Sequence, residues 1–251
     1  MKLTTLEEQI NTKASLDFGA IFNNSIELFK KVWVQGFIVL LLTFICILPC
    51  YLLFYSPVLT GIIVDPEMLR HEEPNLIVLI STFTMFPIIM VLFSAIILLL
   101  NAGFLRICAR VDKNLEGSDD YFYYFKRRYF GKALVLSLVI IGISILGMLL
   151  CFIGAFYVMV PIALIPAFFT FNEDLTPIEM VKASFVLGNK NWGVIFGMLI
   201  VMGFLAQLGI LLCGIGVLFT AMLAKVPIYY MYKDGVGFPT SNNTEDTYLV
   251  K

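Results

Sequence analysis

The run ALVLSLVIIGISILGMLLCFIGAFYVMVPIALIPAFFTF, residues 133–171, contains no charged side chain. About 20 apolar helical residues cross a hydrocarbon core about 30 Å thick, so this run is long enough for two crossings. Its centre, Cys151-Phe152-Ile153-Gly154, is the natural place for the chain to turn back. We therefore predict a membrane hairpin with spans over residues 133–151 and 154–171.

Three further runs have the same apolar character, at residues 32–55, 76–101 and 192–232. The first two are one span each. The third is long enough for two, and Cys213-Gly214-Ile215-Gly216 divides it into spans over 192–213 and 216–232. The sequence thus predicts an all-α integral membrane protein with six transmembrane helices. These form a single membrane domain over residues 1–233, followed by a disordered tail over 234–251.

The composition and the charges agree with this architecture. Of the 251 residues, 60% are hydrophobic and 14% are charged, against about 25% charged in soluble domains. The net charge of −1 provides no basic field, so nucleic acid is not an expected partner. With the N-terminus inside, almost all bases fall on the inner side and Arg70 alone falls outside. The positive-inside rule then predicts that both termini are cytoplasmic.

The sequence also repeats itself. Residues 146–154, LGMLLCFIG, return 62 residues later as LGILLCGIG at 208–216. Amphipathic segments precede the apolar runs at about 15–31, 118–130 and 176–190. The last opens with Thr176-Pro177-Ile178-Glu179, a capping box with proline in the first turn. We predict three repeats of an interfacial helix plus a transmembrane hairpin. Chance similarity of apolar sequences, and ordinary loop helices packed on the bundle, are the alternatives.

Lys225 is the one charged residue within the six predicted spans. A lysine in hydrocarbon costs about 3 kcal/mol on insertion scales, so it needs an explanation. It either extends to the inner headgroups, or it faces a cavity that receives an anionic group such as a lipid phosphate. Asn101 and Gln207 are candidate polar partners, although a single interhelical hydrogen bond would also explain each. Lys126, Arg127 and Arg128 are candidate contacts for anionic lipid.

No catalytic, cofactor-binding or metal-binding residue is predicted. The chain has one histidine, His71, and five cysteines without a CxxC pair. No nucleophile and base can be paired, and there is no glycine-rich phosphate loop.

Several segments resemble a known group of proteins. They are Phe18–Lys31, Ala102-Gly103-Phe104 with Arg106, Asn172-Glu173 through Ile178-Glu179, Ala183-Ser184-Phe185, and Tyr229–Asp234. The chain resembles a bacterial family of six-span membrane proteins related to the membrane domain of glycerophosphodiester phosphodiesterases. This resemblance covers about residues 14–234. It implies a six-helix domain in the bacterial cytoplasmic membrane, without an established activity and without a catalytic residue to transfer.

Two functions are compatible with these observations. We expect a non-enzymatic accessory or scaffold subunit of a larger membrane complex, whose partners are membrane lipids and other membrane proteins. The alternative is a transporter or facilitator for a small anionic or lipid-like solute, with a cavity near Lys225.

The predicted topology can be tested with single cysteines introduced between residues 106 and 130, in a variant that lacks the native cysteines. We expect no reaction with a membrane-impermeant maleimide added to intact cells, because this segment should face the cytoplasm. Reaction after permeabilisation is the control, and reaction from outside would contradict the topology.

Overall fold

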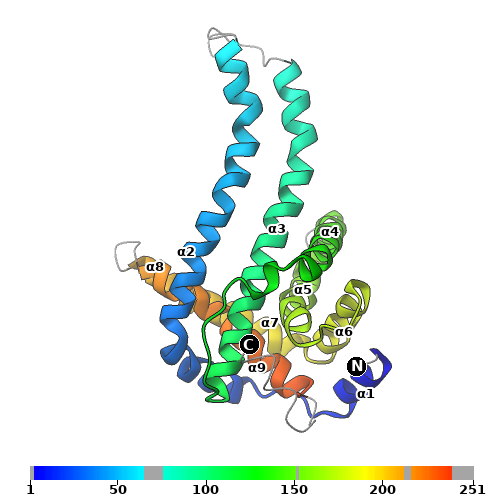
Figure 1. The fold of residues 1–251 in the computed structure, drawn as a ribbon. Helices are drawn as coiled ribbons and strands as arrows, with labels where there is room; N and C mark the ends of the chain where they lie inside the picture. The colour runs from blue at the N-terminus through cyan, green and yellow to red at the C-terminus, as the bar shows by residue number, and fades with distance from the viewer. Residues whose placement is uncertain (1–2, 65–75, 151–152, 212–215, 239–251) are drawn as a thin grey trace.

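The computed structural model describes residues 3–64, 76–150, 153–211 and 216–238, and the secondary structure in these ranges is helical, without strands (Figure 1). The longer helices are α1 (Leu3–Thr12), α2 (Phe18–Val64), α3 (Leu76–Asp112), α4 (Arg127–Leu149), α5 (Ile153–Phe171), α6 (Pro177–Lys190), α7 (Trp192–Gln207) and α9 (Val226–Gly235). The shorter elements are α8 (Gly216–Thr220) and the 3-10 turns η2 (Tyr123–Phe125), η3 (Leu208–Leu211) and η4 (Ala221–Ala224).

Five helices are long and apolar enough to cross a membrane: α2, α3, α4, α5, and α7 continued by η3. At most 44% of the residues in their apolar windows are buried inside the protein, so much of this surface is exposed. Apolar surface on this scale is stable in lipid rather than in water. The chain is therefore an α-helical multi-pass membrane protein, as the apolar runs predict. Both predicted turn sites fall partly outside the described residues, at 151–152 and 212–215.

The segment predicted as the sixth span is not one regular helix. Residues 216–232 form α8, η4 and the first part of α9, with an interruption at Lys225. Pro227 lies in the first turn of α9, where its missing N–H is tolerated, whereas inside a continuous helix it would break the hydrogen-bonding pattern. The count of six spans stays a prediction.

The three predicted interfacial helices have different outcomes. Residues 176–190 correspond to α6, whose capping box is present: the Glu179 N–H donates to Thr176 Oγ1 at 3.4 Å, and the Thr176 N–H donates to Glu179 Oε2 at 2.8 Å. Hydrogen bonds from Thr176 lower the pKa of Glu179, so this contact is present above the ordinary pKa of glutamate and is lost as the pH falls through the lowered value.

The other two expectations were wrong in detail. The segment 15–31 is not a separate helix, because α2 runs without interruption from Phe18 into the apolar run. The segment 118–130 holds only η2 and the start of α4. Here the Asp120 side chain accepts the Phe122 N–H at 3.2 Å, a local bond that competes with helix formation.

The buried core lies at one end of the molecule, where the C-terminal ends of α3 and α5 meet the start of α4, α6 and α9. α9 is buried along nearly its whole length. α2 and α3 pack side by side and extend together well beyond the other helices (Figure 1).

The tail predicted to be disordered from residue 234 is folded as far as Phe238, whose ring centroid lies 5.1 Å from that of Phe171. Packing of this partly buried aromatic ring against the core stabilises the segment.

Glycines at repeat-related positions allow two close helix contacts. A Cβ added to Gly154 in α5 would lie 2.7 Å from the carbonyl oxygen of Gly147 in α4. A Cβ added to Gly209 would lie 2.6 Å from the carbonyl oxygen of Gly216. Small residues commonly permit such backbone contact in membrane proteins. The two contacts occur at the same place in the two sequence copies, which is consistent with the repeat; the threefold arrangement stays a prediction.

We expect Gly154→Ala to lower the free energy of unfolding by on the order of 1–3 kcal/mol, because the new methyl group has no room. Gly131→Ala is the matched control in α4, where nothing lies within 4 Å of an added Cβ. It should be neutral or stabilise by up to about 1 kcal/mol, because alanine restricts the unfolded chain. Thermal unfolding in detergent micelles measures both; equal melting temperatures would contradict the close contact.

Candidate functional site

Lys225 lies at the junction between η4 and α9. Its N–H donates to the Met222 carbonyl at 3.0 Å, and its own carbonyl accepts the Ile228 N–H at 3.2 Å. These short-range bonds satisfy the backbone around the interruption. The side chain is therefore presented at the N-terminus of α9 and not in the middle of a regular transmembrane helix.

A cavity of about 480 Å³ separates Lys225 from the α4–α5 hairpin. This volume is within the usual range for small-molecule sites, about 300–1,000 Å³. Besides Lys225, the described wall is formed by small or apolar residues of α4 and α5: Ser144, Met148, Ala155, Phe156, Val158, Met159, Ile162 and Ala163. The Ser144 hydroxyl donates to the carbonyl of Ile140 at 2.8 Å, so its proton is already engaged. Among the wall residues that the structure describes, Lys225 thus provides the sole charge.

The ammonium group of Lys225 has no hydrogen bond or ion pair with any residue that the structure describes. Its side chain is of intermediate exposure, since it borders the cavity. Uncompensated charge in an apolar environment is unfavourable, and it is normally paired or used. The arrangement is therefore suited to an anionic group placed in the cavity.

The structure does not bring the other predicted polar residues to Lys225. Asn101 is half-buried in α3, and Gln207 is exposed at the end of α7. Neither belongs to the described cavity wall. Among the described residues, the site consists of one cation, the Ser144 hydroxyl and apolar groups, without the amide partners that the sequence suggested.

The basic residues Lys126, Arg127 and Arg128 lie at the beginning of α4, where all three are exposed. Lys126 Nζ is 4.3 Å from the centroid of the Tyr123 ring, a cation–π contact. They are separate from the Lys225 cavity. Their contact with anionic lipid stays a prediction.

A carboxylate that the sequence analysis did not select holds α9 in place. The Tyr229 and Tyr230 hydroxyls donate to the two oxygens of Asp112 at 2.7 and 2.8 Å, and Lys233 forms an ion pair with the same carboxylate. Asp112 is the last residue of α3, so these contacts join the ends of α3 and α9. They position α9, and with it Lys225 at the start of that helix.

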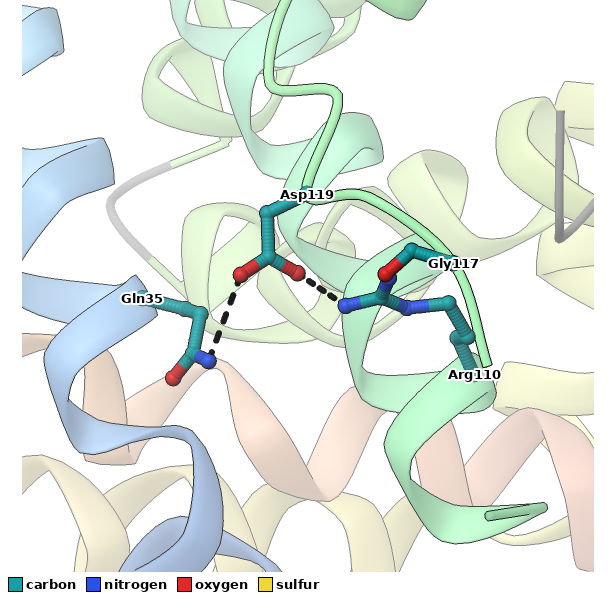
Figure 2. A network of polar contacts seen from close by, with 4 residues as sticks. All are labelled: Gln35, Arg110, Gly117 and Asp119. Carbon is teal, nitrogen blue, oxygen red and sulfur yellow. Dashed lines mark hydrogen bonds and ion pairs between the residues drawn. The ribbon is translucent and has the colours of Figure 1, made fainter. Parts of the chain in front are cut away.

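A second polar network anchors the loop between α3 and α4 (Figure 2). The Arg110 guanidinium donates to the Gly117 carbonyl and forms an ion pair with Asp119, whose other oxygen accepts from Gln35 Nε2 at 3.4 Å. The Arg110 side chain is 8% exposed, so it depends on these partners. Burial, together with the Asp119 charge, raises the pKa of Tyr121 in the same loop.

Two other features of the described residues do not point to a binding site. A cavity of about 190 Å³ between α2 and α3 has an apolar wall that includes Cys50, Phe54 and Met90, with no charged group among its described residues. Within the described part of the chain, no group of three histidine, cysteine, aspartate or glutamate side chains could hold a metal ion. His71 lies outside the described residues.

Comparison with family models, curated proteins and solved structures finds no match to this chain. The resemblance to the six-span bacterial family therefore stays a prediction.

Replacing Asp119 by Asn should destabilise the loop between α3 and α4, because Arg110 loses its counter-charge in a mostly buried position. We expect a loss of about 1–3 kcal/mol and faster proteolysis within residues 113–126. Glu116→Gln is the matched control, since Glu116 is exposed in the same loop. Limited proteolysis in micelles compares the two variants; identical cleavage rates would show that the Arg110–Asp119 pair does not hold the loop.

Proposed function

We propose that the protein is a non-enzymatic facilitator or carrier that binds a small anionic or lipid-like solute in the Lys225 cavity. The observation that supports this proposal is a lysine without a partner among the described residues, beside a cavity of ligand size within the membrane-spanning part of the chain. A lysine that merely extended to the headgroups would need no such cavity.

The interrupted last segment supports the same function. Non-helical backbone at membrane depth is stable where it is buried in protein or lines a cavity. In transporters, discontinuous helices commonly place helix N-termini near anionic groups of the substrate. Lys225 is the N-cap of α9, so a positive side chain and the positive end of a helix lie at one position. Both favour an anion.

The proposal includes the membrane in which the protein resides and the orientation of its termini. The chain resides in a bacterial cytoplasmic membrane with both termini in the cytoplasm. Basic residues on the predicted inner side, such as Arg127, Arg128 and Lys182, support this orientation through the positive-inside rule.

The second candidate function is an accessory or scaffold subunit of a membrane complex. It is favoured by the α2–α3 pair, which extends beyond the other helices (Figure 1). This pair exposes apolar side chains, including Ile63 at 79% and Phe83 at 80%. Partner helices could cover this surface, and so could lipid. A stoichiometric membrane partner retained in mild detergent, and lost when Phe83 is replaced by Asn, would support this function.

Lys225→Met tests the first candidate. Wild type purified from native membranes in mild detergent should retain an anionic small molecule or lipid. Mass spectrometry should find at least about tenfold less of it with the variant, which corresponds to the loss of about 1.4 kcal/mol of binding free energy. Lys182→Met, which removes an exposed lysine from α6, is the control and should retain the wild-type amount. Equal retention by wild type and Lys225→Met would contradict the proposal.

A further inference from the structure

We infer that the ligand of the Lys225 cavity is an amphiphile with one anionic headgroup, a carboxylate or a phosphodiester, and an apolar chain, and that it enters from the hydrocarbon of the bilayer. This inference rests on the proposed function and adds the class of ligand and its route.

The hydrogen-bond donors of the cavity wall limit the headgroup. Among the described wall residues, Lys225 supplies the one ammonium, and the Ser144 hydroxyl already donates to the Ile140 carbonyl. The remaining described wall residues have apolar side chains. A sugar, a polyol or a phosphate monoester would bring several polar groups that remain unpaired, and each would weaken binding. A single carboxylate or phosphodiester needs only one cation.

The apolar residues of the wall favour a chain attached to that headgroup. Phe156, Met159 and Ile162 recur at the spacing of one face of α5, so they line the cavity side by side. Ligand pockets of this kind combine a mostly apolar wall with a few polar groups that fix orientation. The headgroup would lie at Lys225 and the chain along α5.

The edge of the cavity favours entry from the membrane. Met148 in α4 is 60% exposed and Phe156 in α5 is 58% exposed, although both line the cavity. Both residues lie within apolar spans, where the exposed surface of the protein faces lipid. An amphiphile already dissolved in the bilayer can enter between these side chains, whereas a hydrated anion would have to leave water first.

The experiment uses the full-length protein in nanodiscs of phosphatidylcholine and a palmitate probe that carries a diazirine in its chain. Irradiation followed by mass spectrometry should locate the label on the described wall residues, within 144–148 and 155–163. Lys225→Met should reduce labelling at least about tenfold, whereas Lys225→Arg should retain it, because the positive charge remains. Lys182→Met is the control. Ala163→Phe leaves Lys225 in place and fills the cavity, so it should also abolish labelling, and its folding is checked by size-exclusion chromatography.

Competitors identify the class of ligand. Excess palmitate or phosphatidylglycerol should displace the probe; which of the two is stronger distinguishes a fatty acid from a phospholipid. Palmityl alcohol, butyrate and inorganic phosphate should displace it poorly. If butyrate or phosphate competes as well as palmitate, the inference that the ligand is an amphiphile is wrong, whereas the proposal that Lys225 binds an anion stands. If no labelling or displacement depends on Lys225, both this inference and the proposed function are wrong.

Discussion

The carboxylate of Asp112 receives two tyrosine hydroxyls and the Lys233 ammonium from α9, and these contacts fix the last helix inside the bundle. α9 is almost completely buried, so its polar side chains need partners within the protein. Tyr232 finds one in Asn172, whose side-chain oxygen accepts its hydroxyl at 2.7 Å. A helix of ten residues is about 15 Å long. Tyr229 and Tyr230 follow Lys225 by four and five residues, about 6–8 Å along the helix, so their contacts with Asp112 help to determine the position of Lys225.

The lysine and the helix interruption form one feature. A continuous span at this position would place Pro227 inside the helix, where it breaks the regular hydrogen-bonding pattern, and would expose Lys225 on the helical surface. The interruption replaces part of that pattern with the bonds from Lys225 to Met222 and from Ile228 to Lys225. Such irregular backbone is stable in a membrane protein only where protein or a cavity surrounds it. The buried contacts of α9 and the apolar hairpin α4–α5 supply that environment.

Features that depend on local sequence were predictable, and those that depend on distant contacts were not. Hydropathy predicted the long apolar helices, and the Thr176–Glu179 box predicted the start of α6 because its bonds are local. The segment 118–130 was predicted as a helix, but the contacts of Arg110 with Asp119 and the preceding Gly117 hold the first part of this segment in a loop conformation. Lys225 could be selected because charge is rare in spans, whereas the cavity beside it depends on how α4 and α5 pack. Asp112 was not predicted. The signal that could have identified it is an acidic residue at the end of an apolar run, together with Tyr229, Tyr230 and Lys233 near the C-terminus.

The cavity lies between two parts of the chain and not within one of them. Its apolar wall belongs to the α4–α5 hairpin, where Gly147 and Gly154 hold the two backbones in contact. Its charge belongs to the last segment, which Asp112 anchors to α3. A change in the distance between these parts would widen or narrow the cavity without breaking either contact, as in carriers whose halves move around a site. A ligand with headgroup and chain joined would contact both parts at once, so its binding free energy would depend on how far apart they stand.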